Sequence, residues 1–151
     1  MAVYLVQHGK SLSKEKDPAK GLSDTGRQET MKIADVARMY KVPVSKILHS
    51  GKTRAEQTAQ IFRDILKKDA PLEKTDGIGP LDDVTDLGSR IDPASDIMIV
   101  GHLPYMERLV SFLTGGNPEL QVIRFQNSGI VCVDREEKSW FIKWTLNPHI
   151  R

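Results

Sequence analysis

The chain has 151 residues, of which 39% are hydrophobic and 28% are charged, as expected for one soluble domain with a sizeable core. Its net charge of +2 is too small to indicate a nucleic-acid-binding protein. The single cysteine, Cys132, excludes an internal disulfide and is typical of a reducing compartment. The N-terminal apolar run is too short for a signal peptide, and no run approaches a membrane span. We therefore expect one cytoplasmic domain over residues 1–151, without a membrane partner.

The first third of the chain is predicted to contain a strand, a loop and a helix. An apolar run predicts a strand over residues 2–7, and a lysine-rich loop is expected over 9–22. A helix should begin near Ser23 to Thr25, because Thr25 and Gln28 have capping-box spacing. This helix should end at residues 41–44. Its expected apolar face consists of Met31, Ile33, Ala34, Val36 and Ala37.

A second strand and a second helix are predicted next. Residues 45–49 form the strand, and the segment 50–54 leads into a helix that continues to about Lys68. The expected core face of this helix consists of Ala55, Ala59, Phe62, Ile65 and Leu66. A short strand is expected at residues 72–75.

The middle of the chain contains its clearest buried strand, over residues 96–102. The polar segment that precedes it is expected to hold one helical turn, at residues 83–90. A helix should follow from Pro104, since proline is well tolerated in the first turn of a helix, and should stop at Gly115-Gly116.

The C-terminal part is predicted to form strands over residues 120–125, 129–134 and 140–146, with a hairpin loop at 135–138. Trp140 and Trp144 alternate on the last strand and are expected to pack on a sheet face or in the core. Strand–helix alternation followed by a hairpin indicates an α/β fold. We predict a three-layer sandwich whose central sheet is mainly parallel, with an antiparallel C-terminal edge.

Three predicted strands end in histidines, namely His8, His49 and His102. In open α/β sheets, ligands bind beyond the carboxyl ends of the strands. Arg54 follows the second of these strand ends closely enough to reach inward. Two histidines and an arginine at one sheet edge suit a phosphate dianion. His49 is interpreted as a structural residue or a pocket neighbour, and His149 as part of a solvated tail.

This group of residues predicts phosphoryl transfer. A neutral imidazole can attack phosphorus if one ring nitrogen is free and the other is held as N–H by an acceptor. His8 is the predicted nucleophile, because Gly9 lets the backbone turn sharply and approach a ligand. Arg54 should bind two phosphoryl oxygens, and a protonated His102 would donate to a third.

Four segments, in order and at suitable spacing, resemble the histidine phosphatase superfamily. They are Leu5-Val-Gln-His-Gly9, Leu22-Ser-Asp-Thr-Gly26, Ser50-Gly-Lys-Thr-Arg-Ala-Glu-Gln-Thr58 and Gly101-His-Leu-Pro104. The chain length and the third and fourth segments are most similar to the SixA-type phosphohistidine phosphatase branch. The resemblance implies a phosphoglycerate mutase-like fold, with His8 as the phosphorylated nucleophile and Arg54 and His102 in the phosphate pocket.

One position departs from the family pattern. The family motif begins Arg-His-Gly, whereas Gln7 precedes His8 in this chain. Glutamine can donate a hydrogen bond but carries no charge, and loss of one oxyanion donor typically costs about 2.7–4 kcal/mol, or roughly 10²–10³ in rate. Lys10 and Lys52 are the candidates to supply a partial replacement, as point charges without the planar guanidinium.

A general acid is the remaining part of the predicted site. Family members that cleave alkyl phosphates use a carboxylic acid, and Asp82 and Asp83 are the candidates by chain order. An ordinary polar loop is the simpler interpretation of these two residues. An imidazole leaving group needs less acid assistance than an alkoxide, and the short segment between Arg54 and His102 leaves little room for a lid. Both points favour a protein-borne phosphohistidine substrate.

We therefore predict a metal-independent phosphatase, without a cofactor, that removes phosphate from phosphohistidine in a signalling protein. No Cys/His cluster has zinc-site spacing. Two alternatives remain: a small-molecule phosphomonoesterase that uses Asp82 or Asp83, and a phosphate- or phosphoprotein-binding relative whose catalysis is weakened at Gln7.

Overall fold

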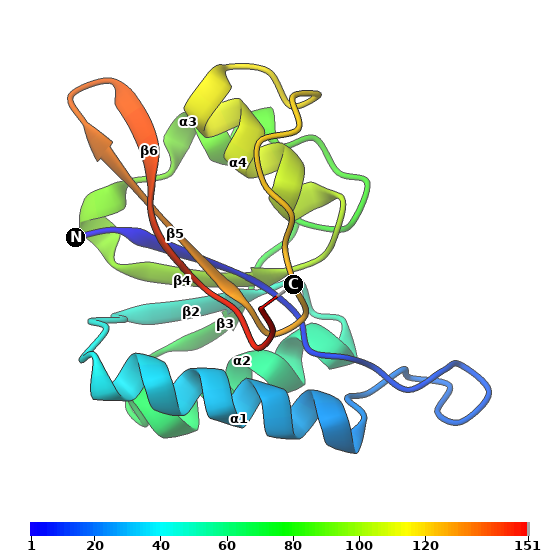
Figure 1. Cartoon of the computed structure of the whole chain (residues 1–151). Coiled ribbons are helices and arrows are strands. Elements are labelled where there is room, and N and C mark those ends of the chain that lie inside the picture. The colour runs from blue at the N-terminus through cyan, green and yellow to red at the C-terminus, as the bar shows by residue number, and fades with distance from the viewer. Residues whose placement is uncertain (151) are drawn as a thin grey trace.

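The structure, a computed structural model, describes residues 1–150. Its strands form one six-stranded sheet in the order β3-β2-β4-β1-β5-β6 (Figure 1). The strands are β1 (Val3–Gln7), β2 (Lys46–His49), β3 (Leu72–Lys74), β4 (Ile97–Gly101), β5 (Ile130–Glu136) and β6 (Ser139–Leu146). The helices are α1 (Asp24–Met39), α2 (Thr53–Leu66), α3 (Thr85–Arg90) and α4 (Tyr105–Gly115), with a 3₁₀ turn at Pro93–Ser95.

The sheet has a parallel part and an antiparallel edge, as predicted. β4 lies between β1 and β2 and pairs in parallel with both, and β2 pairs in parallel with β3. β5 runs antiparallel to β1, and β6 runs antiparallel to β5. The carboxyl ends of β1, β4 and β2 therefore meet at one edge, where ligands of such sheets bind.

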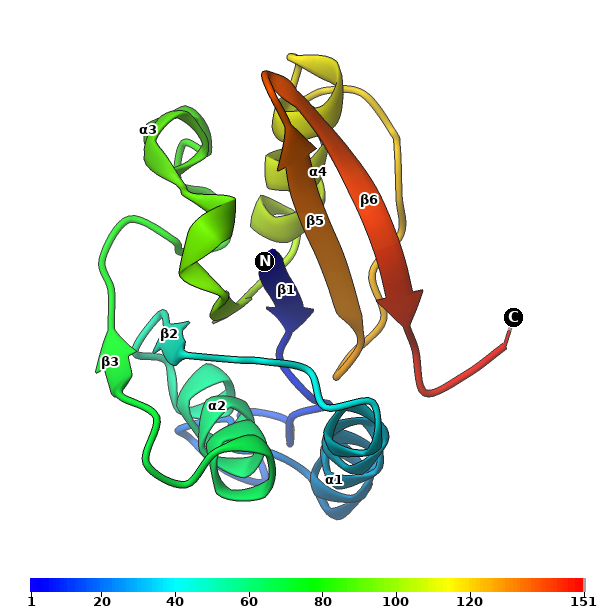
Figure 2. The same cartoon turned by 90° about the vertical axis from the view of Figure 1, so that its left-hand side faces the viewer.

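Helices cover both faces of the sheet and make the predicted three layers. α1 and α2 lie on one face, and α3 and α4 lie on the other (Figures 1 and 2). Side chains of β1 alternate between two apolar clusters: Tyr4 and Val6 pack toward α1 and α2, and Val3 and Leu5 pack toward α4. This alternation buries both faces of the strand, which is why its sequence is a continuous apolar run.

A β-bulge places the two tryptophans of β6 in different clusters. Cys132 lies opposite Trp144, whereas the next residue, Val133, lies opposite Ile142, so β6 has one extra residue. Because one extra residue reverses which face a side chain points to, Trp144 packs with the α1 side and Trp140 with the α4 side. Both were correctly expected to pack on the sheet.

The predicted strand at residues 120–125 is wrong. Residues 121–126 have no regular structure, and their backbone lies along α4 instead of joining the sheet. Ser111 Oγ donates to the Leu120 carbonyl (2.6 Å), and the Phe125 N–H donates to Glu107 Oε2 (2.8 Å). Side chains of a helix thus accept and donate the hydrogen bonds that a neighbouring strand would otherwise make.

α1 begins at Asp24, within the predicted range Ser23 to Thr25, but its N-cap and its buried face differ from the expectation. Ser23, and not Thr25, is the N-cap, and its hydroxyl accepts from the Gly26 N–H (3.0 Å). Met31 is 49% exposed, whereas Thr30 is fully buried. The apolar pattern misses this because Thr30 Oγ1 donates to the Gly26 carbonyl and contacts Ser128 Oγ, so a polar side chain is buried without an unpaired group.

The C-terminal segment is docked, although His149 was expected in a solvated tail. The His149 N–H donates to Gln126 Oε1 (3.1 Å), and Gln126 Nε2 donates to the His149 carbonyl (3.0 Å). The His149 ring contacts the carboxylate of Glu29 on α1. None of the helices within residues 1–150 combines the length and the apolar character needed to cross a membrane.

Candidate active site

His8 and His102 lie side by side because their strands are neighbours. Gln7 at the end of β1 is paired with Gly101 at the end of β4, and each histidine follows its strand directly. The His8 N–H donates to the Gly101 carbonyl (3.0 Å). The two imidazole rings have centroids 5.1 Å apart and are inclined at 52°. The parallel pairing thus joins two segments that are more than 90 residues apart in the chain.

The hydrogen bonds of His8 define its tautomer. Nδ1 lies 2.7 Å from the Gly9 carbonyl oxygen, which can only accept, so Nδ1 carries the proton. Nε2 therefore has the free lone pair, and the Arg54 Nε–H donates to it at 3.3 Å. A nucleophilic nitrogen thus faces a guanidinium group, which is where a phosphoryl group would be attracted.

Both imidazoles are held in their neutral form. Burial lowers the pKa of His8 from 6.5 to about 4; the bond to Gly9 opposes this, and the charges of Arg54 and Lys20 add to it. Burial, followed by His8, Arg54 and Lys52, lowers the pKa of His102 to about 3. A neutral His8 has the lone pair that nucleophilic attack requires. A protonated His102, by contrast, would need the added negative charge of a bound phosphate.

Ser50, which the sequence reasoning missed, completes the cluster from the third strand end. Its Oγ lies 2.6 Å from His102 Nε2. His49 points elsewhere: its Nδ1 accepts from the Gly51 N–H (3.0 Å), and its Nε2 lies 3.9 Å from Glu56. The side chains of consecutive strand residues point to opposite faces, so either His49 or Ser50 can face His102, and Ser50 does.

Thr58 and Asn127 hold the backbone around His8 and were also missed. The Gly9 N–H donates to Thr58 Oγ1 (2.9 Å), which donates to the Arg54 carbonyl (2.7 Å). Asn127 Nδ2 donates to the His8 carbonyl (2.9 Å). Thr58 lies one helical turn after Arg54, a spacing that could have indicated it. No feature of the sequence indicates Asn127, because it lies in an irregular segment far along the chain.

Glycines let α1 pack directly against the backbone that follows His8. A Cβ on Gly9 would lie 2.8 Å from Thr30 Oγ1, and a Cβ on Gly26 would lie 2.1 Å from the Lys10 carbonyl oxygen. The second separation is far below a van der Waals contact and involves backbone atoms, which cannot rotate away. The position of residues 9 and 10 therefore depends on the absence of a side chain at Gly26.

Gly26→Ala should destabilise the protein even though alanine favours helices. Overpacking a tight site usually costs about 1–3 kcal/mol in the free energy of unfolding, and each kcal/mol lowers Tm by about 2–4 °C in a chain of this size. Thermal unfolding followed by circular dichroism measures the change. Thr25→Ala is the matched control, because Thr25 is exposed, and a Tm loss equal in both variants would contradict this explanation.

Gln7 and the two lysines considered as replacements for the missing arginine occupy different environments. The Gln7 side chain has a buried Oε1 with no hydrogen-bond partner, and it brings no charge to the site. Lys10 is exposed, and its carbonyl accepts from the backbone N–H and hydroxyl of Ser23. Lys52 is exposed and precedes α2 as its N-cap.

Asp82 and Asp83 take part in local turns. Asp82 Oδ2 accepts from the Gly79 N–H (2.7 Å), and Asp83 Oδ1 accepts from the Thr85 N–H and hydroxyl, both at 2.9 Å. The bonds from Thr85 hold the pKa of the exposed Asp83 below its ordinary value, so this side chain stays an ionised carboxylate with no proton to donate. No contact within residues 1–150 joins either carboxylate to His8.

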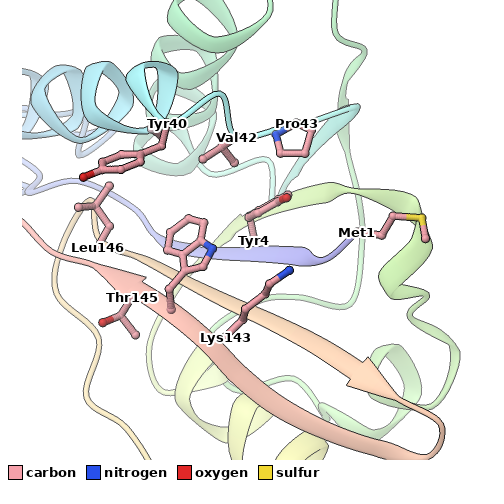
Figure 3. Close-up of a pocket in the computed structure, with 10 residues that line it drawn as sticks. Met1, Tyr4, Tyr40, Val42, Pro43, Lys143, Thr145 and Leu146 are labelled. Atoms are coloured by element: carbon pink, nitrogen blue, oxygen red, sulfur yellow. The ribbon is translucent and has the colours of Figure 1, made fainter.

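A separate apolar pocket of about 570 Å³ lies at the other end of β1, between the end of α1 and β6 (Figure 3). It is lined by Met1, Tyr4, Ala37, Tyr40, Val42, Pro43, Lys143, Trp144, Thr145 and Leu146. We place the functional site at the histidine cluster, because a charged phosphoryl group needs several N–H donors. Among residues 1–150, no cluster of three His, Cys, Asp or Glu side chains could hold a metal ion.

The lowered pKa values of His8 and His102 predict how the protonation of His8 and the stability of the fold depend on pH. An NMR titration of the His8 ring should give a pKa of about 4, so the ring stays neutral down to pH 5. Between pH 6.5 and 4 the unfolded chain binds more protons at His8 and His102 than the folded chain does, so stability should fall as pH falls. A His8 pKa near 6.5 in the folded protein would contradict the buried, neutral site.

Known proteins are similar to this chain over nearly its full length. No family model matches the chain. Phosphohistidine phosphatase SixA of Escherichia coli (strain K12) is 25% identical over 155 residues, which cover 98% of this chain and 94% of SixA. The uncharacterized phosphatase PhoE of Bacillus subtilis (strain 168) is 25% identical over 188 residues, covering 99% of this chain and 96% of PhoE.

A solved structure of a SixA protein is also similar to this chain. The protein histidine phosphatase SixA complexed with tungstate has a TM-score of 0.84 and 26% identity to this chain, with 98% of this chain and 97% of SixA covered. The homologues and structural neighbours of this chain are therefore SixA phosphohistidine phosphatases and other members of the histidine phosphatase superfamily, and the chain has the phosphoglycerate mutase-like fold of SixA.

Proposed function

We propose that the protein is a metal-independent phosphatase that removes phosphate from phosphohistidine through a phosphorylated His8. One observation carries this proposal: the free Nε2 of a neutral His8 lies 3.3 Å from Nε of Arg54 and beside the ring of His102. Phosphoryl transfer needs an in-line nucleophile and cations around the equatorial oxygens, and little other chemistry.

The reaction would proceed in two displacements. In the first, His8 Nε2 attacks phosphorus, the bond from phosphorus to the substrate imidazole breaks, and the departing nitrogen takes a proton from solvent. In the second, water attacks the phosphoryl group on His8 and releases inorganic phosphate, which returns His8 to its neutral form. Arg54 would stabilise the oxygens in both steps, and its bond to Nε2 would give way as the phosphoryl group enters.

Two observations favour phosphohistidine over an alkyl phosphate. Asp82 and Asp83 are engaged in turns and make no contact with His8, whereas an alkoxide leaving group would need a positioned acid. SixA of Escherichia coli is named a phosphohistidine phosphatase, and the similar solved structure is named a protein histidine phosphatase. The physiological substrate would then be a phosphohistidine-bearing signalling protein, and a small phosphomonoesterase becomes the weaker alternative.

Gln7 supports a second candidate, a phosphate-binding relative with weak turnover. Its uncharged amide stands where the family motif has arginine, and its Oε1 is buried without a partner. Gln7→Arg should therefore raise the rate of phosphate release, by up to about 10²–10³ if the arginine reaches the phosphate. An unchanged rate in Gln7→Arg would show that the site already has the charge it needs.

The deciding experiment is steady-state phosphate release from a phosphohistidine-carrying protein domain. Wild type is compared with Gln7→Arg, with His8→Ala as the blank, and phosphoserine and p-nitrophenyl phosphate serve as ester substrates. Turnover by wild type well above the blank, with phosphohistidine preferred, supports the phosphatase. Turnover by Gln7→Arg alone supports the binding relative. Preference for the esters would contradict the phosphohistidine assignment.

A further inference from the structure

The loop that follows His8 is a folded turn. The Leu12 N–H donates to the Gly21 carbonyl (2.8 Å), and Ser11 pairs with Leu22 in an antiparallel bridge. Inside the turn, the Asp17 carboxylate accepts from the Gly21 N–H (2.9 Å) and from the Ala19 N–H (3.1 Å). Figure 1 shows the loop extending beyond the edge of the sheet before the chain returns to α1. The residues of its returning arm are thus held in defined positions.

The returning arm is anchored to the helix that carries Arg54. The Leu22 N–H donates to Gln57 Oε1 (2.7 Å), and a Cβ on Gly21 would lie 3.1 Å from the same oxygen. Gln57 lies three residues after Arg54 on α2, and residues with this spacing share one face of a helix. The arm therefore runs over the face of α2 that presents Arg54 to His8.

Lys20 immediately precedes this anchor. Its backbone has a φ of +53°, an uncommon conformation for lysine, which the bond from its N–H to the Asp17 carbonyl (2.8 Å) holds in place. Lys20 is half-buried, whereas Lys14 and Lys16 of the same loop are exposed. Lys20 is therefore partly withdrawn from solvent on the arm that Gln57 holds against α2.

The charge of Lys20 acts on the nucleophile. It is one of the two cations, with Arg54, that lower the pKa of His8, whereas the charge of Lys52 acts on His102. Lys10 follows Gly9 in the chain, but it is exposed and contributes its carbonyl to the start of α1. Because its arm is anchored to Gln57 on the helix that carries Arg54, the half-buried Lys20 is a better candidate than the exposed Lys10 to reach the site.

We propose that Lys20 binds the phosphoryl group and provides the positive charge that is missing at Gln7. This proposal rests on the proposed function, because it assigns the group that Lys20 meets. An ammonium would contact one phosphoryl oxygen as a point charge, while Arg54 contacts two. Lys20 is then a phosphate-binding residue of the reaction, and the lysine-rich loop is part of the active site.

The test measures anion binding as well as turnover. Isothermal titration calorimetry with inorganic phosphate compares wild type with Lys20→Gln, and with Lys16→Gln as the exposed control in the same loop. Lys20→Gln should weaken phosphate binding about tenfold and lower kcat/KM on phosphohistidine about 10–100-fold, with an unchanged Tm. Lys16→Gln should stay within twofold of wild type in both. Equal phosphate affinity and kcat/KM in wild type and Lys20→Gln would overturn the proposal.

A double variant tests whether Lys20 and residue 7 serve the same phosphate. Gln7→Arg should restore phosphate binding to Lys20→Gln, and the two changes should be non-additive, because either cation can meet the anion. Fully additive effects would show that Lys20 does not supply the charge that is missing at Gln7. If wild type binds phosphate through Lys20 but turns nothing over, the proposed function fails while the binding role of Lys20 stands. If wild type and Lys20→Gln turn phosphohistidine over equally, the proposed function stands and the binding role of Lys20 fails.

Discussion

His8→Ala should abolish phosphate release while the fold survives. Removal of a covalent nucleophile typically lowers kcat by about 10⁵–10⁶, because no other group in the site can form the phosphoryl intermediate. His8 is half-buried at the end of β1, and its backbone bonds to Gly101 and Asn127 do not involve the ring. The variant should therefore unfold with a near-normal Tm. Phosphate release from a phosphohistidine-carrying domain measures the loss.

The same variant should still bind inorganic phosphate, since Arg54 and His102 remain. His49→Gln is the matched control: His49 also ends a strand at this edge and is buried, but its ring points toward Gly51 and Glu56. We expect its kcat/KM to remain within a few-fold of wild type. Normal turnover by His8→Ala, or an equal loss in His49→Gln, would contradict the assignment of His8 as nucleophile.

Arg54→Ala should lower kcat/KM by about 10²–10³, which corresponds to the 2.7–4 kcal/mol typical of one lost oxyanion donor. Because the Arg54 charge also lowers the pKa of His8, the variant should raise that pKa toward its ordinary value. Steady-state kinetics and an NMR titration of the His8 ring measure the two effects separately. Both should appear together, since they have the same cause.

Arg54→Lys should recover only part of the rate, because an ammonium keeps the charge but not the bidentate geometry. Arg63→Ala is the control on the same helix; Arg63 pairs with Asp64 and takes no part in the site. If Arg54→Lys matched wild type, the planar guanidinium would have no special role. If Arg54→Ala kept full activity, the phosphate would bind elsewhere.

Much of the fold follows from local patterns. The apolar runs of β1 and β4 and the glycine stop of α4 at Gly116 are properties of a few consecutive residues, and they were predicted correctly. The segment 120–125 has the same apolar, β-branched character but is not a strand, because α4 supplies its hydrogen-bond partners. A residue pattern cannot show which neighbour a backbone will pair with.

The candidate site was likewise predicted in part from local patterns and missed where it depends on contacts between distant segments. His8 and His102 were expected together, because parallel strands place their carboxyl ends at one edge, and the structure brings them and Arg54 into contact. Ser50 and Asn127 were missed. Both reach His8 or His102 through contacts between segments that are distant in the chain. Metal independence, the acid role of Asp82 or Asp83, a single domain and a cytoplasmic location stay predictions.

Apart from the segment 120–125, the sequence by itself determined the order of strands and helices, and it determined the residue types at the strand ends that make phosphoryl transfer chemically reasonable. These depend on short-range periodicity and on side-chain chemistry, both of which can be read from neighbouring residues. Only the tertiary structure decided the tautomer of His8, the choice of Ser50 over His49, and which lysine lies near the nucleophile. Each of these depends on burial and on hydrogen bonds between distant segments, which arise only when the chain is packed.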